Sequence, residues 1–177
     1  SFGLLFLYPI HVDLAGLLQI HQRRFDALSR TRRHLEDVAT MAANPFYHGL
    51  SLRLRALNAY HLRRFEQAYR WAKQAAGRIA QSLGKSIHLS RCDLIMGMAA
   101  YHLRDLRGAG VALEAARDLF SRVSCSLSLV ETNLGLSLVE REKRNAEEAD
   151  RLLETALALA QTKEYDSLPL LSADDIL

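Results

Sequence analysis

The chain has 177 residues, of which 49% are hydrophobic and 24% are charged, and its formal net charge is +3. This composition supports a buried core, and so small a net charge does not by itself indicate nucleic-acid binding. No apolar run reaches the roughly 18 residues that a membrane span needs, so no membrane association is expected. Cys92 and Cys125 are the only cysteines, which suits a reducing, cytoplasmic compartment better than a disulfide framework.

Apolar residues recur at helical spacing in eight segments, which few prolines or glycines interrupt. Asn44 can serve as an N-cap with Pro45 as the first helical residue, and Gly84 can serve as a C-cap. In chain order, we predict helices at residues 4–22, 25–42, 46–63, 65–82, 87–103, 106–122, 126–142 and 146–162.

One short phrase appears three times, as IHQRRF at residues 20–25, YHLRRF at 60–65 and YHLRDL at 101–106. Self-similarity at a period of about 40 residues is typical of stacked helical repeats. The sequence therefore predicts an all-α repeat domain over residues 1–168, built of four helix-turn-helix units with a period of 40–41 residues. The predicted units are 4–43, 45–84, 86–123 and 125–163.

Small residues recur within the predicted units, where they allow two helix backbones to approach closely. In the second unit Ala56 precedes Ala68 by the same interval that separates the corresponding small residues of the third unit. In the fourth unit the interval from Gly135 to Ala149 is longer by two, which predicts two extra residues in the turn. The third unit has the clearest pattern, with steps of 12, 4 and 3 between Gly97, Ala109, Leu113 and Ala116.

This pattern of small and large residues resembles the tetratricopeptide repeat, and the long units resemble the repeat region of large bacterial transcription activators of the MalT type. The resemblance implies a right-handed superhelix of antiparallel helix pairs. It also implies a non-enzymatic scaffold, the sensor or interaction segment of a larger cytoplasmic regulator, which binds a protein, a peptide or a small effector. The candidate residues lie on the first helices, at the concave face: Arg53, Leu57, Tyr60, Arg91, Leu94, Met98, Tyr101, Thr132 and Leu136.

The turns between paired helices are rich in arginine, which predicts a basic edge along the stack. This edge could contact an acidic partner or a phosphate backbone, or it could be a solvated edge whose cations suit helix C-termini. His21, His61 and His102 occupy equivalent places, too far apart to share a metal, and we expect them to cap helix ends. Direct nucleic-acid binding is not expected. The edge comprises Arg23, Arg24, Arg63, Arg64, Arg104 and Arg107.

No nucleophile elbow, HExxH motif, phosphate-binding loop or cysteine pair at metal-ligand spacing occurs. We therefore expect neither an enzyme nor a bound metal or cofactor. Residues 169–177 begin with Pro169 and contain Ser172 to Asp175, which has the form of a helix start. This predicts a further, truncated helix and a protein that continues beyond both ends. Alternatively, the ends pair with another copy and the chain is a self-association module.

Overall fold

The computed structural model describes residues 2–22, 24–165 and 168–171, without the side chains of residues 2–10, 21 and 25. Arg23, the imidazole of His21 and the helix start expected at 172–175 therefore lie outside the described residues.

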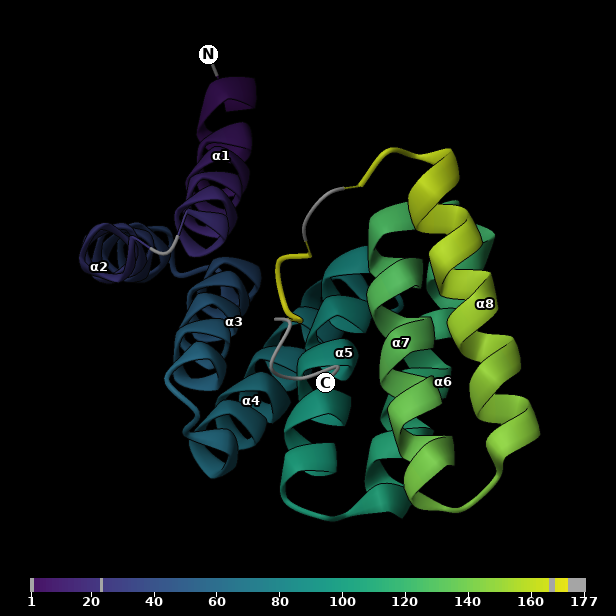
Figure 1. Ribbon diagram of the computed structural model, residues 1–177. Coiled ribbons are helices and arrows are strands. Elements are labelled where there is room, and N and C mark those ends of the chain that lie inside the picture. Colours follow the sequence, from purple (N-terminus) through teal and green to yellow (C-terminus); the bar gives the residue numbers. More distant parts are fainter. Residues whose placement is uncertain (1, 23, 166–167, 172–177) are drawn as a thin grey trace.

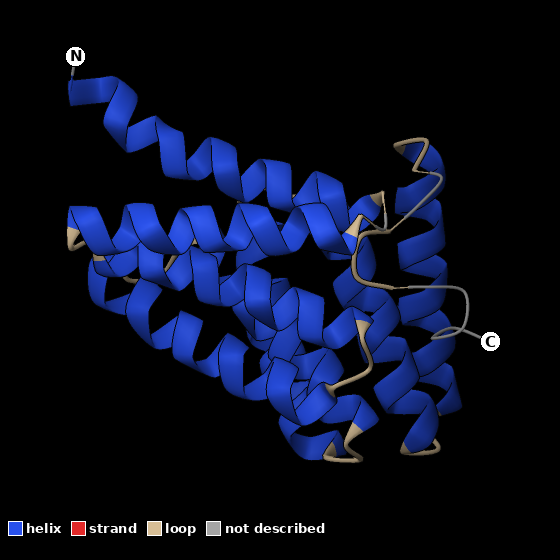
Figure 2. Ribbon diagram, turned by 90° about the vertical axis from the view of Figure 1, so that its left-hand side faces the viewer, coloured by secondary structure: helices blue, strands red, loops and turns tan. Residues whose placement is uncertain are grey.

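Eight helices and no strand are present in the described part of the chain (Figure 2). Their ends lie within two residues of the predicted ones, which confirms the all-α fold. Asn44 caps the third helix through a 2.9 Å hydrogen bond from the Phe46 N–H, and Gly84 ends the fourth. The helices are α1 (Phe2–His21), α2 (Phe25–Ala42), α3 (Pro45–His61), α4 (Phe65–Leu83), α5 (Ile87–His102), α6 (Leu106–Arg122), α7 (Ser126–Glu142) and α8 (Ala146–Thr162).

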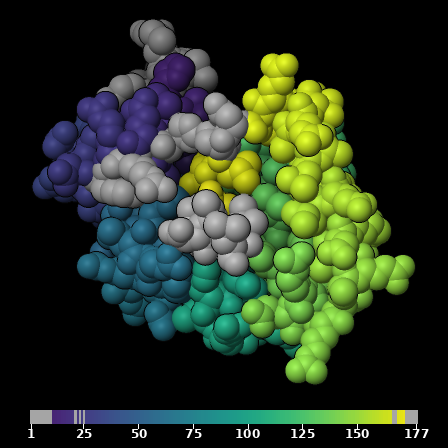
Figure 3. All heavy atoms as spheres, viewed as in Figure 1, coloured from purple at the N-terminus to yellow at the C-terminus, as the bar shows by residue number. Residues whose placement is uncertain are grey.

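Each helix packs against the next one in the chain, and α1, α3, α5 and α7 also contact one another in that order (Figure 1). This is the arrangement of an α-solenoid-like stack of helix pairs. The face formed by α1, α3, α5 and α7 is the inner face. Residues 168–171 return to this face after α8, between the N-terminal helices and α7 (Figures 1 and 3).

The repeated phrase forms the turn between the two helices of a unit. Arg63 and Arg104 adopt the left-handed conformation there, with φ of 56° and 64°. The chain then reverses, and backbone N–H groups cap the helix end: the Arg63 N–H donates to the Tyr60 carbonyl at 2.8 Å and the Arg64 N–H to the Ala59 carbonyl at 2.9 Å. These carbonyls therefore need no cap from a cationic side chain. The imidazole of His102 instead lies 3.1 Å from the Tyr60 hydroxyl of the preceding unit.

The longer turn expected in the fourth unit is wrong. α7 ends at Glu142 and α8 begins at Ala146, so the turn has the same length as that between α5 and α6. The small residue that faces Ala149 is Ser137, which donates a 2.8 Å hydrogen bond to the Ala149 carbonyl. Gly135 has another partner, because a Cβ at that position would lie 2.6 Å from the Met98 sulfur on α5.

Candidate functional site

A cavity of about 430 Å³ lies on the inner face, enclosed on one side by the segment that follows α8. We call this cavity the inner groove. Leucine and isoleucine make up half of its lining residues, which also include two arginines and two glutamates. The helices contribute Leu17, Leu18, Arg53, Leu57, Arg91, Leu94, Ile95, Leu127, Ser128 and Glu131. Residues 164–165 and 168–171, which follow α8, are called the returning segment, and they contribute Glu164, Tyr165, Pro169 and Leu170.

Four of the nine concave-face candidates line the inner groove, namely Arg53, Leu57, Arg91 and Leu94. The other five do not, because their side chains turn into the helix stack. Thr132 illustrates this, since it is fully buried and donates a 2.6 Å hydrogen bond to the Ser128 carbonyl. Tyr60, Met98 and Leu136 are also buried in the core, and Tyr101 packs against it.

A buried ion pair joins the first two units at the wall of the groove. Arg53 on α3 donates from Nη2 to Oδ2 of Asp13 on α1, and each side chain is only about 1% exposed. Arg53 Nε and Asp13 Oδ1 have no hydrogen-bond partner among the described residues. The pair therefore holds a guanidinium in a fixed place beside the cavity, with one donor unused.

α5 places two further basic side chains near this ion pair. Burial, and then the charge of Arg53, lowers the pKa of His88 to about 4, so its imidazole is neutral at physiological pH. Burial also lowers the pKa of Arg91, followed by repulsion from Arg53. Arg91 forms no ion pair with any described residue. It is thus a largely desolvated cation on the groove wall, which forms a hydrogen bond with the Cys125 side chain and has no carboxylate partner among the described residues.

Glu131 on α7 is the group that holds the returning segment. Its Oε1 accepts a 2.6 Å hydrogen bond from the Leu170 N–H, and Leu170 and Leu171 are only 2% and 6% exposed. Burial raises the pKa of Glu131 to about 7, although this hydrogen bond and the charge of Arg91 act in the opposite direction. A carboxylate buried in an apolar groove thus binds a backbone N–H of an irregular segment.

Asp13, Glu131 and the returning segment were not among the site residues predicted from the sequence. A signal for the two carboxylates was present, because Asp13, Arg53, Arg91 and Glu131 follow one another at intervals of 40, 38 and 40 residues. A charged residue that recurs near the repeat period on the first helices indicates a column of charges along the inner face. No comparable pattern marks residues 168–171, whose place depends on contacts distant in sequence.

The basic edge lies apart from the inner groove. Arg24, Arg63, Arg64, Arg104 and Arg107 are exposed. Arg104 forms a 2.8 Å ion pair with Glu142, which joins neighbouring turns. The role of the edge stays a prediction.

Within the described residues, no group of three or more histidine, cysteine, aspartate or glutamate side chains could hold a metal ion. None of the described helices combines the length and the apolar character needed to cross a membrane. The chain matches no protein-family model, no curated protein and no solved structure. Fold and site together define an all-α, helical-repeat-like protein whose inner groove holds a segment of its own chain.

Proposed function

We propose that this protein is a non-enzymatic scaffold that binds an extended, leucine-rich segment of a partner protein in its inner groove. One observation carries the proposal: residues 168–171 already lie in that groove as an irregular, apolar segment. That a segment of the chain itself occupies the groove supports an extended apolar peptide as its ligand.

The contacts of this segment are those that any extended peptide could make. Glu131 accepts a backbone N–H, and burial of two leucine side chains removes apolar surface from water. The Arg91 guanidinium on the groove wall is a donor that suits backbone carbonyl groups. Main-chain hydrogen bonds of this kind give affinity, and apolar pockets for side chains give specificity.

The wider context is also a proposal, and it rests on the resemblance to tetratricopeptide and MalT-type repeats. On this view the helix pairs wind into a right-handed superhelix and form the interaction segment of a larger cytoplasmic bacterial transcriptional regulator. The complete coding sequence tests the regulator assignment. An ATPase motif or a helix-turn-helix encoded in the same reading frame supports it, and a reading frame that encodes neither overturns it.

A labelled peptide with the sequence of residues 164–171, EYDSLPLL, tests the groove by fluorescence anisotropy. In the unaltered protein the segment competes from within the same chain, at an effective concentration on the order of millimolar. We expect the double variant Leu170→Ser, Leu171→Ser to bind the peptide at least about tenfold more tightly, because its own segment docks poorly.

The matched control is the double variant Val111→Ser, Leu157→Ser, which alters two exposed apolar residues on α6 and α8. It should bind the peptide like the unaltered protein. Circular dichroism shows whether both proteins are folded. If they are folded and the peptide binds saturably to neither the unaltered protein nor the Leu170→Ser, Leu171→Ser variant, the groove does not accept such peptides.

A second candidate function is self-association, which exposed apolar residues on the first unit favour. Leu14, Leu18 and Met41 are 50%, 56% and 79% exposed, and apolar surface of this kind marks protein contacts when it is contiguous. Light scattering at high protein concentration separates the candidates. A strict monomer removes self-association and leaves peptide binding intact.

A further inference from the structure

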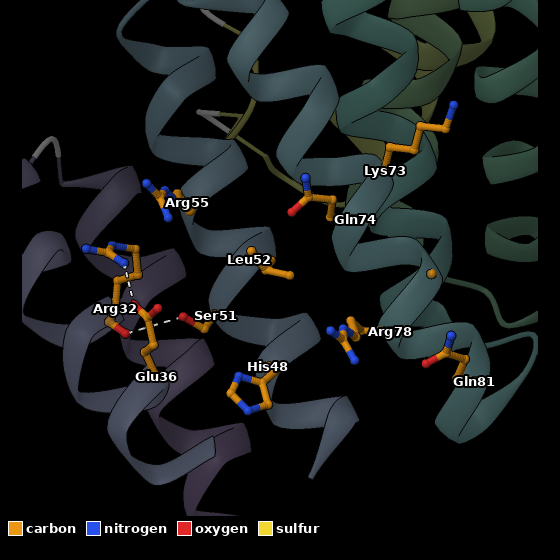
Figure 4. A pocket seen from close by; sticks show the side chains of 11 residues that line it. Arg32, Glu36, His48, Ser51, Leu52, Arg55, Lys73, Gln74, Arg78 and Gln81 are labelled. Carbon is orange, nitrogen blue, oxygen red and sulfur yellow. Dashed lines mark hydrogen bonds and ion pairs between the residues drawn. The ribbon is translucent and has the colours of Figure 1, made fainter. Parts of the chain in front are cut away.

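A second cavity, of about 540 Å³, lies between α2, α3 and α4 and shares no lining residue with the inner groove (Figure 4). We call it the outer groove. α3 forms its floor, and α2 and α4 form its two sides. Its charged lining residues are Arg32 and Glu36 from α2, Arg55 from α3, and Lys73 and Arg78 from α4.

The outer groove carries an excess of positive charge. Glu36 is the only acid among its lining residues, and a 2.8 Å ion pair with Arg32 neutralises it. Arg55 lies over the ring of Trp71, 3.8 Å from its centroid, which leaves the edge of the guanidinium free to donate. Lys73 and Arg78 form no ion pair with any described residue.

Positive charge is also distributed unevenly along the chain, with an excess in its first half. Residues 1–85 contain thirteen lysines and arginines against five aspartates and glutamates, whereas residues 86–177 contain ten against fifteen. The net charge of +3 therefore conceals a strongly basic first half, and the outer groove lies within it. Such a field raises the local concentration of anions at the groove.

The uncharged lining residues indicate which kind of anion fits. Glutamine and histidine side chains supply further hydrogen-bond donors, whereas the Ser51 hydroxyl already donates to the Arg32 carbonyl. Leu52 is the one large apolar residue among the lining residues. A phosphate group offers three acceptor oxygens that suit arginine's planar fork, so a site rich in donors and poor in apolar surface matches phosphate better than a hydrophobic acid. The volume is that of a small-molecule site.

Gly77 on α4 is an independent indication that this space is kept open. A Cβ at this position would meet no atom within 4 Å, and the residue lies inside a helix rather than at a turn. Neither packing nor backbone conformation requires glycine here, although glycine weakens a helix by about 1 kcal/mol relative to alanine. A larger side chain at position 77 would narrow the outer groove.

We propose that the outer groove binds a compact ligand that carries two or more linked phosphate groups, which Arg55 and Arg78 clamp from adjacent helices. Isothermal titration with sodium tripolyphosphate tests this, at low salt and at physiological salt. We expect one saturable site per chain, weakened by added salt as for any partly exposed ion contact. The double variant Arg55→Gln, Arg78→Gln should lose at least about tenfold in affinity.

Two further variants distinguish a built site from a general attraction of opposite charges. Gly77→Leu changes no charge and favours the helix, yet it should weaken tripolyphosphate binding as strongly as the double variant. The matched control Arg107→Gln, Lys163→Gln removes the same charge elsewhere and should change the affinity less than twofold. An equal loss in this control, or full binding by Gly77→Leu, would overturn the proposal.

Competing ligands test the assigned class. A hexaglutamate peptide and a deoxythymidine decamer should each bind at least about tenfold more weakly than tripolyphosphate. If either binds as tightly, the groove is an acidic-peptide or nucleic-acid surface and the phosphate assignment is wrong. Thermal melts confirm that each variant is folded. Lys73→Gln replaces an exposed lysine that forms no ion pair with a described residue, and it should cause a smaller loss of tripolyphosphate affinity.

Discussion

The substitution Glu131→Gln tests the energetic consequence of a carboxylate buried in the inner groove. Burial raises its pKa from the usual 4.5 to about 7 in the folded protein. Between these two values the folded chain holds a proton that the unfolded chain has released. The free energy of unfolding therefore falls as the pH rises through this range. The shift corresponds to about 3 kcal/mol, fully expressed above pH 7.

Glutamine retains an oxygen that can accept the Leu170 N–H but cannot ionise. The pKa of about 7 already includes the stronger hydrogen bond that the charged carboxylate accepts from Leu170, so the neutral amide loses nothing further relative to the protonated acid. We therefore expect the variant to be more stable than the unaltered protein by about 3 kcal/mol at pH 8, and to be no more stable at pH 4.

Urea unfolding at half-unit steps from pH 4 to 8 measures both curves. Other buried groups also titrate: burial raises the pKa of Asp93 to about 6, and the pKa of His88 is lowered to about 4. Asp93 makes the protein less stable with rising pH, as Glu131 does, whereas His88 has the opposite effect. Both are present in the two proteins, so the difference curve isolates Glu131. Parallel curves across the range, or a less stable variant at pH 8, would refute the reasoning.

Other substitutions have outcomes that follow from the packing and from the backbone conformation. Asp13→Ala should lower the free energy of unfolding by roughly 3 kcal/mol, because it leaves the Arg53 guanidinium buried without its partner. The double variant Asp13→Leu, Arg53→Met should restore most of this loss, and urea unfolding measures both. Gly97→Ala should destabilise the protein by about 1–3 kcal/mol, because the added Cβ would meet a leucine side chain at 2.6 Å. Gly77→Ala adds a Cβ that meets no atom within 4 Å, so it should stabilise the protein by about 0.5–1 kcal/mol. Thermal melts measure both changes. Arg63→Gly should stabilise by about 0.5–1 kcal/mol because φ of 56° favours glycine, and an unchanged or lower melting temperature would contradict this.

The helices could be predicted from the sequence because each depends on local spacing and on caps such as Asn44. The unit turns were recognisable from their repeated phrase, although the phrase did not show that Arg63 takes the left-handed conformation. The interval between Gly135 and Ala149 was misread as an insertion because Ser137, small enough for close approach, holds the expected place. A pattern of small residues does not distinguish the alternative partners of a glycine.

The inner groove was predictable only in part, for a different reason. Helical spacing places Leu57 and Tyr60 on neighbouring stripes of α3, and the sequence does not show which stripe turns toward the adjacent helix. Both prove to be buried, but only Leu57 lies on the groove wall. The contact between Glu131 and Leu170 joins residues 39 apart across an irregular segment. No local pattern encodes such a contact.

Besides turn residues with positive φ such as Arg63, three residues that weaken the fold lie at the two grooves. Glu131 lowers stability above its shifted pKa, Arg91 is desolvated without an ion pair, and Gly77 weakens a helix whose packing does not require glycine. The first two are charged groups whose burial is only partly compensated, and the third is a glycine inside a helix that makes no close contact of the kind that Gly97 makes. Such violations are expected where a surface must hold a ligand as well as fold. Substitutions that relieve them should therefore stabilise the protein and impair binding at the groove concerned, and a variant that gains on both counts would argue against a binding role for that groove.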